Sequence, residues 1–263
     1  MGLKKRQLVS DTIKNLPLLC LTAYTKPIAE IVDLYADIIL VGDSLGTVLY
    51  GFESTREVTL DLMINHAKAV CRSTSRANVI VDMPFGTYEH SRIKAYNNAK
   101  KIIERTGACG VKLEGGEKIA PTIEYLVNRG IEVMGHIGML PQSAKNFKDY
   151  KVYGKQEWEM KQILKDIISL EKSGVFAVVI EATTEPLSKR VSKTVNIPTI
   201  GIGASCQCSG QILVTEDLIG LTTFEAKFVK KYCNLRKEII NALEKFKTEV
   251  KKKKFPSKKF CYK

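Results

Sequence analysis

The stretch DIILVGDSLG, residues 37–46, places an aspartate just after a short run of apolar residues. The residues from Ile38 to Val41 form an unbroken hydrophobic run, which is typical of a parallel strand that is buried on both faces. The chain then passes through Gly42 to Asp43 and Ser44. The stretch therefore predicts a buried parallel strand with a carboxylate at its carboxyl end.

Similar apolar runs recur along the chain and alternate with stretches of helical periodicity. They predict eight strands, at residues 16–24, 37–42, 78–84, 109–116, 131–138, 175–182, 197–204 and 211–220. They also predict helices at 57–75, 91–106, 118–129 and 156–173, with one or two more over 224–253. Eight such units favour a closed (β/α)8 barrel, the TIM barrel, within the α/β class. An open doubly wound sheet is the alternative, but no G-x-G-x-x-G motif opens a helix after the first strand.

The composition fits one domain of this kind. The chain has 263 residues, 44% of them hydrophobic and 26% charged, which is ordinary for a globular protein. The formal net charge is +13, and many lysines fall in the C-terminal run KFKTEVKKKKFPSKKFCYK. We expect a single domain over 1–263 that ends in a solvated basic tail at about 251–263. A patch for nucleic acid or anionic membrane is the other interpretation, but no nucleic-acid-binding motif accompanies the lysines.

The cysteines and the hydrophobic runs point to a protein of the cytoplasm. The seven cysteines are scattered, and only Cys206 and Cys208 are close in sequence. This spacing suits neither a zinc site nor a disulfide framework, so reduced thiols are expected. No apolar run approaches the roughly 20 residues that a membrane-spanning helix needs. We therefore expect no membrane association and a cytoplasmic location.

Polar side chains gather at the ends of five successive predicted strands, the second to the sixth. They are Asp43 and Ser44, Asp82, Lys112 and Glu114, His136, and Glu181. In a (β/α)8 barrel the carboxyl ends of the strands form one rim, where active sites are built. The sequence therefore predicts a polar site at this rim.

Each of these residues also has a simpler interpretation. An acid at a strand end often caps a helix, Lys112 can pair with a neighbouring acid, and His136 can be a hydrogen-bonded core residue. Helix capping alone does not easily explain why five successive predicted strands all end in ionisable side chains. Lys112 and Glu114 are two residues apart in a strand and so point to the same face, while Leu113 points the other way.

The charges at the rim favour a bound cation. Asp43, Asp82 and Glu114 would repel one another and lose hydration in one barrel mouth unless a cation lay among them. Oxygen ligands with at most one histidine nearby favour Mg²⁺ first and Mn²⁺ second. Glu181 lies on a separate, apolar strand, where burial raises the pKa of a carboxyl group toward the range of a general base.

At these residues the chain resembles the ketopantoate hydroxymethyltransferase family. Four motifs carry most of the resemblance: VGDSLG (41–46), DMPFG (82–86), KLEGG (112–116) and GHIG-x-x-PQS (135–143). Further matching segments are TAY (22–24), VIEA (179–182), IPTIGIGA (197–204), GQILVTEDLIG (210–220) and KFVKKY (227–232). The matches follow one another in order over about residues 20–256.

The resemblance implies a phosphoenolpyruvate-mutase-like (β/α)8 barrel that forms a homo-oligomer, often a decamer. It implies Mg²⁺-dependent transfer of the one-carbon unit of 5,10-methylenetetrahydrofolate to 3-methyl-2-oxobutanoate, which gives 2-dehydropantoate in pantothenate biosynthesis. The metal aspartates of the family fall on Asp43 and Asp82, and its third metal-associated acid falls on Glu114. The substrate-contacting positions fall on Asp43, Ser44, Asp82 and Lys112, with His136 expected to hydrogen-bond a bound oxygen. The proton acceptor of the family falls on Glu181.

The chain departs from the family pattern at a few positions. Thr25, Ser205, Ser209 and Ala226 stand where the family usually has aspartate, glycine, aspartate and proline. None is an expected metal or base position, so these departures bear on oligomer contacts and folate affinity rather than on the chemistry. A Mg²⁺-dependent 2-keto-acid lyase or aldolase of the same barrel group is the alternative function. The absence of a cysteine in and around KLEGG tells against a cysteine-dependent lyase.

Overall fold

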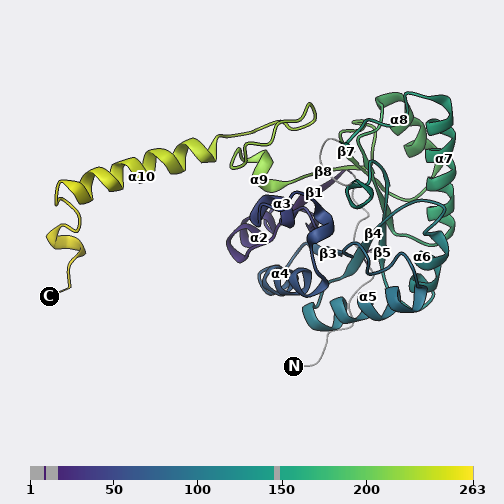
Figure 1. Ribbon diagram of the computed structural model, residues 1–263, viewed down its shortest axis with the longest axis horizontal. Coiled ribbons are helices and arrows are strands. Elements are labelled where there is room, and N and C mark those ends of the chain that lie inside the picture. Colours follow the sequence, from purple (N-terminus) through teal and green to yellow (C-terminus); the bar gives the residue numbers. More distant parts are fainter. Residues whose placement is uncertain (1–8, 10–16, 145–148, 263) are drawn as a thin grey trace. The chain divides into compact units, whose positions relative to one another are not determined.

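Eight parallel strands close into a barrel, as the alternating pattern predicts (Figure 1). The computed structural model describes residues 9, 17–144 and 149–262. Neighbouring strands follow chain order, and β8 pairs with β1 to close the sheet. The strands are β1 (Leu18–Thr22), β2 (Ile38–Val41), β3 (Asn78–Asp82), β4 (Gly110–Glu114), β5 (Val133–Gly138), β6 (Ala177–Glu181), β7 (Thr199–Ile202) and β8 (Gly210–Leu213).

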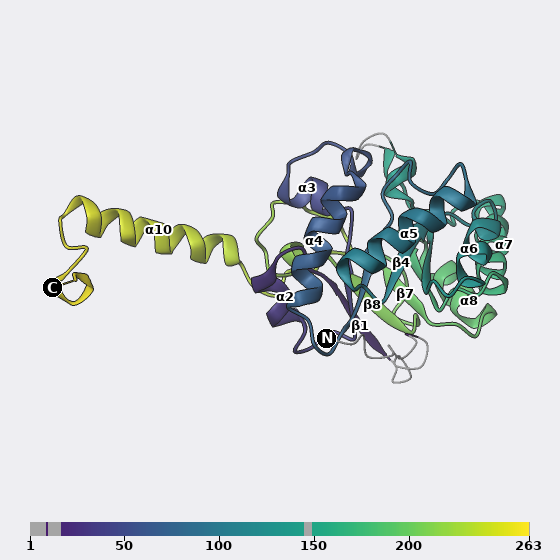
Figure 2. The ribbon, with the colours of Figure 1, turned by 90° about the horizontal axis from the view of Figure 1, so that it is seen from below.

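Helices follow the strands and lie outside the barrel, as Figures 1 and 2 show for α4 to α7. They are α2 (Lys26–Val32), α3 (Leu45–Leu49), α4 (Leu60–Arg72), α5 (Arg92–Thr106), α6 (Ala120–Val127), α7 (Glu157–Lys172) and α8 (Glu185–Thr194). Two short 3₁₀ helices, η1 (Thr55–Glu57) and η2 (Pro141–Ser143), lie in the long loops after β2 and β5.

Local sequence signals begin and end these helices. The Thr59 side chain accepts a hydrogen bond from the Leu62 amide at the start of α4, and Ser91 accepts one from Lys94 at the start of α5. Such caps satisfy backbone N–H groups that have no partner inside the helix. Helix α5 ends at Gly107, whose φ of 81° is a left-handed conformation that glycine adopts without strain.

The strands β2 to β7 are largely buried on both faces because their side chains alternate between two hydrophobic clusters. In β1 and β8, Leu19 and Gln211 are exposed. In β2, Ile38 and Leu40 belong to the cluster inside the barrel, and Ile39 and Val41 belong to the cluster between the strands and the helices. Leu113 of β4 belongs to the outer cluster, as its position between Lys112 and Glu114 predicts. The same alternation carries the inner face of each strand up to the rim.

The end of the eighth predicted strand differs from the sequence expectation. The strand was expected over 211–220, but β8 ends at Leu213 and the short helix α9 covers Thr215–Leu218. Thr215, Glu216 and Asp217 are residue types that favour the first turn of a helix, so they end the strand despite the apolar residues that follow.

The chain divides into two compact units, Met1–Val214 and Thr215–Lys263. The second unit contains α9, the helix α10 (Leu235–Lys251) and the 3₁₀ helix η4 (Lys258–Phe260). No residue of α10 is buried. The single domain with a basic tail stays a prediction. Among the described residues, no helix is both long and apolar enough to cross a membrane.

Candidate active site

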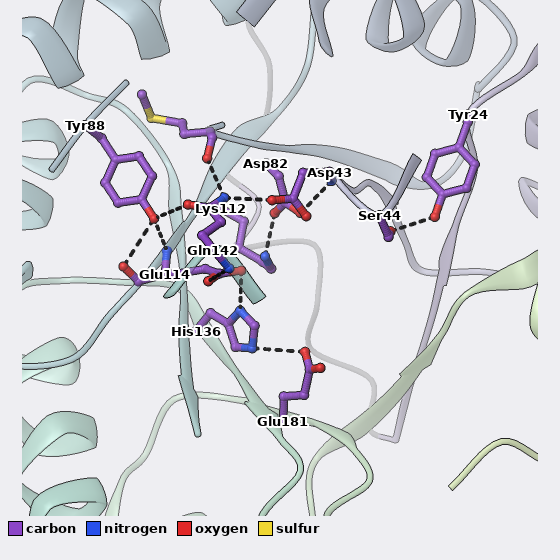
Figure 3. A network of polar contacts seen from close by, with 11 residues as sticks. Tyr24, Asp43, Ser44, Asp82, Tyr88, Lys112, Glu114, His136, Gln142 and Glu181 are labelled. Carbon is purple, nitrogen blue, oxygen red and sulfur yellow. Dashed lines mark hydrogen bonds and ion pairs between the residues drawn. The ribbon is translucent and has the colours of Figure 1, made fainter. Parts of the chain in front are cut away.

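The rim residues that the sequence singles out come together because of strand alternation and register (Figure 3). Asp82 of β3 lies beside Lys112 of β4, and Glu114 of β4 lies beside His136 of β5. Glu181 ends β6, where Gly138 is its register partner on β5. Parallel pairing thus brings four neighbouring strand ends to one edge of the barrel mouth.

Asp82 and Lys112 form a buried ion pair. Lys112 Nζ lies 2.6 Å from Asp82 Oδ1, and about 5% or less of either side chain is exposed. Burial alone would lower the pKa of Lys112, but the nearby carboxylates of Asp82, Glu114 and Asp43 outweigh it and raise this pKa above its ordinary value. The lysine is therefore a permanent cation on the inner face of the rim.

Asp43 follows β2 and lies against Asp82. Its backbone amide donates to Asp82 Oδ2 at 3.1 Å, and the whole residue is only 4% exposed. Burial, followed by the charges of Asp82 and Glu114, raises the pKa of Asp43 well above its ordinary value, against the opposing effect of Lys112. The surroundings of this carboxylate disfavour its own charge, which a bound cation would stabilise.

His136 lies between two carboxylates from neighbouring strands. Its Nδ1 is 3.5 Å from Glu114 Oε1, and its Nε2 is 3.2 Å from Glu181 Oε2. Burial and the Lys112 charge lower the pKa of His136, but Glu114 and Glu181 outweigh them and raise it to about 9. The imidazolium thus links Glu181 to the other acids of the rim.

Glu181 is the most accessible acid of the rim, with 17% of its side chain exposed. Hydrogen bonds hold its backbone and that of the next residue. Its carbonyl accepts a hydrogen bond from the Met139 amide at 2.9 Å. The next residue, Ala182, has a φ of 46°, a left-handed conformation that costs a non-glycine residue about 1 kcal/mol. Ala182 keeps this conformation because its amide donates to the Ile202 carbonyl and its carbonyl accepts from the Tyr153 amide, both at 2.9 Å.

Ser44 does not act as a simple helix cap. It occupies the N-cap position of α3, but its side chain makes no capping hydrogen bond. Its Oγ lies 2.7 Å from the hydroxyl of Tyr24, which is buried beside β1. The hydroxyl is thus oriented by another side chain rather than used by the helix.

Three further residues complete this polar network and were not assigned by the sequence analysis. Tyr24 holds Ser44, while Gln142 and Tyr88 bond to one another and to the acids of the rim (Figure 3). All three lie within matched segments, TAY, GHIG-x-x-PQS and DMPFG with its continuation. They lie outside the strands, however, so strand periodicity gave no sign that they face the site.

The donor set fits a magnesium ion with two protein ligands. In the described part of the chain, no three side chains of His, Cys, Asp or Glu are grouped so that they could hold a metal ion. Mg²⁺ commonly takes one or two carboxylates and keeps water or substrate at its other positions. Asp43 and Asp82 supply two such carboxylates. Glu114 as a third metal-associated acid stays a prediction, since its Oε2 accepts from the Gln142 amide at 3.0 Å and its Oε1 faces His136.

The fold first defines a class, the closed parallel (β/α)8 barrels. The structure is similar to a phosphonopyruvate hydrolase, with a TM-score of 0.63 and 10% identity over 96% of this chain and 90% of that one. It is also similar to phosphoenolpyruvate phosphomutase from Streptomyces platensis subsp. rosaceus, with a TM-score of 0.60 and 12% identity over 93% and 85% of the two chains. At these identities the likeness establishes the fold.

Sequence similarity then gives the family. The family model for ketopantoate hydroxymethyltransferase matches residues 3–258, and the chain belongs to this family. It is 52% identical to the 3-methyl-2-oxobutanoate hydroxymethyltransferase of Pelagibacter ubique over 93% of this chain and 94% of the relative. It is 49% identical to the enzyme of the same name from Rhizobium etli, over 94% and 91% of the two chains.

Proposed function

We propose that this protein is a 3-methyl-2-oxobutanoate hydroxymethyltransferase. It takes the one-carbon unit of 5,10-methylenetetrahydrofolate and adds it to the keto acid as a hydroxymethyl group, giving 2-dehydropantoate. Family membership and relatives of that name at about half identity support this activity. The observation that carries the chemistry is the buried rim, in which paired carboxylates, a lysine and a histidine stand beside one more accessible glutamate.

Asp43 and Asp82 are the residues that would hold Mg²⁺. When bound, the ion supplies a Lewis acid for the carbonyl of the keto acid. The raised pKa of Asp43 supports this assignment, because a divalent cation would stabilise the charge that burial and Asp82 disfavour. Glu114 adds negative charge to the same mouth and holds His136 through its Oε1.

Lys112 and Ser44 orient the substrate. Lys112 is buried and cationic, so it offsets the carboxylate of the keto acid in a site where water screens charge poorly. Ser44 offers a hydroxyl that Tyr24 holds in place. His136 presents N–H groups from between two carboxylates and hydrogen-bonds a substrate oxygen.

Glu181 is the general base. Its carboxylate accepts the proton from C3 of the keto acid, and the electron pair of that C–H bond forms the enolate. The nucleophilic C3 then bonds to the methylene carbon that the folate carries. Over the whole reaction both bonds from that carbon to the folate nitrogens break, a water molecule supplies the hydroxyl group of the product, and the folate leaves as tetrahydrofolate. The accessibility of the Glu181 side chain and its anchored peptide support this role, because a base must reach the substrate from a fixed position.

We also propose a cytoplasmic homo-oligomer, with a decamer as the expected form. Helix α10 supports self-association, since it has the residue spacing of an amphipathic helix and buries none of its residues. Ile239, Leu243, Phe246 and Val250 recur at intervals of three or four residues and are 40–60% exposed. Sedimentation of the purified chain would give the oligomer size.

Product formation tests the proposal. Purified protein should form ketopantoate from the keto acid and methylenetetrahydrofolate with Mg²⁺, and a chelator should abolish the reaction until Mg²⁺ is restored. Folded protein that forms no product under these conditions would refute the assignment. Cleavage of a 2-keto acid or its aldol in the absence of folate would instead support the Mg²⁺-dependent lyase.

A further inference from the structure

Gln142 is a buried loop residue whose side-chain amide and backbone N–H have partners at the rim (Figure 3). It lies in η2, after β5, and is 3% exposed. Its Nε2 donates to Asp43 Oδ2 at 2.8 Å and to the Met83 carbonyl at 2.9 Å. Its Oε1 accepts from the Tyr88 hydroxyl at 2.7 Å, and its backbone amide donates to Glu114 Oε2 at 3.0 Å. One residue therefore connects the ends of β2, β3 and β4.

The partners leave one orientation for the Gln142 amide group. Nε2 faces a carbonyl and a carboxylate, which have no proton to donate when Asp43 is ionised, so the NH₂ group must lie there. Oε1 faces the Tyr88 hydroxyl, which accepts a hydrogen bond from the Glu114 amide at 3.2 Å. The hydroxyl proton has two acceptors within reach, Gln142 Oε1 at 2.7 Å and the Glu114 carbonyl at 3.3 Å, and the shorter contact is to Gln142. A reversed amide would lose the bonds to Asp43 and to the Met83 carbonyl. The Met83 carbonyl, which can only accept, thus fixes the orientation in which Gln142 donates to Asp43, and the Tyr88 hydroxyl holds Oε1 in that orientation.

The loop that carries Gln142 also holds the backbone of the proposed base. The Met139 amide, three residues before Gln142, donates to the Glu181 carbonyl at 2.9 Å. One short segment therefore bonds to the proposed metal carboxylate through a side chain and to the proposed base through its backbone. The segment therefore holds two groups of the proposed active site.

We infer that Gln142 is a positioning residue that fixes the Asp43 carboxylate for metal binding, and that Tyr88 acts through it by holding its Oε1. The inference rests on the proposed function, in which Asp43 is a metal ligand. Partners that orient metal-binding carboxylates typically contribute about 10-fold to 100-fold to metal affinity or activity. A residue that only filled a buried space would instead contribute to stability and leave metal affinity unchanged.

Gln142→Met is the main variant, because methionine keeps the length and apolar stem but neither donates nor accepts at the amide positions. Gln162→Met is its matched control. Gln162 lies on the exposed face of α7, and its Nε2 also donates to an aspartate, Asp166 Oδ1, at 2.9 Å. The dissociation constants of Mn²⁺ and Mg²⁺ are measured by calorimetry on the complete protein without substrate. Thermal unfolding without metal, and kcat and KM for the keto acid, are measured on the same samples.

Gln142→Met should weaken Mn²⁺ and Mg²⁺ binding by about 10-fold to 100-fold, while Gln162→Met should stay within about twofold of the unaltered protein. At saturating metal, kcat should recover toward the unaltered value, since the loss lies in positioning the ion. Folded Gln142→Met with unaltered metal affinity would overturn the inference. The proposed function would be refuted separately, by unaltered protein that binds no Mg²⁺ and forms no product.

Tyr88→Phe tests the second part and guards against poor folding of Gln142→Met. It removes one hydroxyl and leaves Gln142 in place, so metal affinity should fall by less than in Gln142→Met. Adding Tyr88→Phe to Gln142→Met should then cost little further affinity, because both changes act on one contact. Tyr125→Phe on the outer helix α6 is the control. Unchanged metal affinity in Tyr88→Phe, or full additivity in the double variant, would overturn the role of Tyr88.

Discussion

Two buried aspartates near opposite ends of the barrel have opposite surroundings. Asp33 follows α2 at the end where strands begin, and Asp43 follows β2 at the end where they finish. Asp33 accepts from the amides of Ser75 and Ala77, each at 2.8 Å, from Arg76 at 3.0 Å and from the Ser75 hydroxyl at 2.9 Å. Burial would raise the pKa of Asp33, but these hydrogen bonds together outweigh it and lower the pKa. The pKa of Asp43 is instead raised, first by burial and then by like charges.

The difference shows how one residue type serves two purposes. Donors surround Asp33, so its charge is stabilised in the folded chain and it ties the loop before β3 to the end of α2. Asp43 lies among other acids, and burial and these acids disfavour its charge more than Lys112 favours it. The first carboxylate contributes to stability. Under the proposed function the second gives up stability for a binding site, which is a common exchange at active sites.

The largest expected effect is a loss of activity, and it arises at the rim. Glu181→Gln removes the proposed base, so kcat should fall by about 10²-fold to 10⁴-fold. Exchange of the C3 proton of the keto acid in heavy water, followed by nuclear magnetic resonance, should fall with it. Glu157→Gln on the exposed surface of α7 is the matched control. Exchange at the unaltered rate would remove Glu181 from the role of base.

Asp33→Ala should have the opposite profile. It leaves several backbone N–H groups without their acceptor, so the free energy of unfolding should fall by about 2–4 kcal/mol. Activity per folded molecule should be unchanged, because Asp33 lies at the other end of the strands. Urea unfolding and active-site titration measure the two quantities. Asp61→Ala, which removes an exposed ion pair with Lys101, should lower the free energy of unfolding far less than Asp33→Ala. A loss of activity without a loss of stability in Asp33→Ala would show that Asp33 does not serve stability alone.

The contributions of His136 and Asp33 to stability, at the two ends of the barrel, should be lost at opposite extremes of pH. The pKa of His136 is raised from 6.5 to about 9 by Glu114 and Glu181, against burial and Lys112. Its stabilising effect should therefore be fully present below about pH 6.5 and lost as pH rises through about 9. The contribution of Asp33, whose pKa is lowered, should be present above its ordinary pKa of 3.8 and lost as pH falls through the lowered value.

Urea unfolding of the metal-free protein at a series of pH values from 6 to 9.5 measures the His136 effect. His136→Gln should flatten the decline between about pH 6.5 and 9, since the amide does not titrate there. Asp33→Ala should leave that decline in place. An equal decline in His136→Gln and in the unaltered protein would show that another group causes it.

The smallest expected effect concerns backbone strain beside the base. Ala182→Gly removes a left-handed alanine but adds freedom to the unfolded chain, so stability should change by less than about 1 kcal/mol. The looser peptide after Glu181 should lower kcat by less than about tenfold. Lys253→Gly is a matched control, since Lys253 also has a positive φ, 51°, and lies in the C-terminal unit. A kcat equal to that of the unaltered protein would show that the strain at Ala182 does not position the base.

The sequence by itself determined the fold class and the rim residues. Unbroken apolar runs can satisfy both faces of a strand only in a parallel sheet between layers, and eight of them with intervening helices close into a barrel. The inner position of Lys112 and Glu114, with Leu113 facing outward, follows from the two-residue period of a strand. The end of β8 was misjudged, because helix-starting residues at 215–217 outweighed the apolar pattern.

Only the tertiary structure decided which of these groups touch and which loop residues join them. Strand register sets Asp82 against Lys112 and Glu114 against His136, and periodicity along one strand carries no information about its neighbour's register. Gln142 and Asp43 are 99 residues apart in the chain, and no local pattern links them. Their contact depends on how the loop after β5 folds over the rim, which the hydrogen-bonding needs of buried polar groups fix once the barrel has closed.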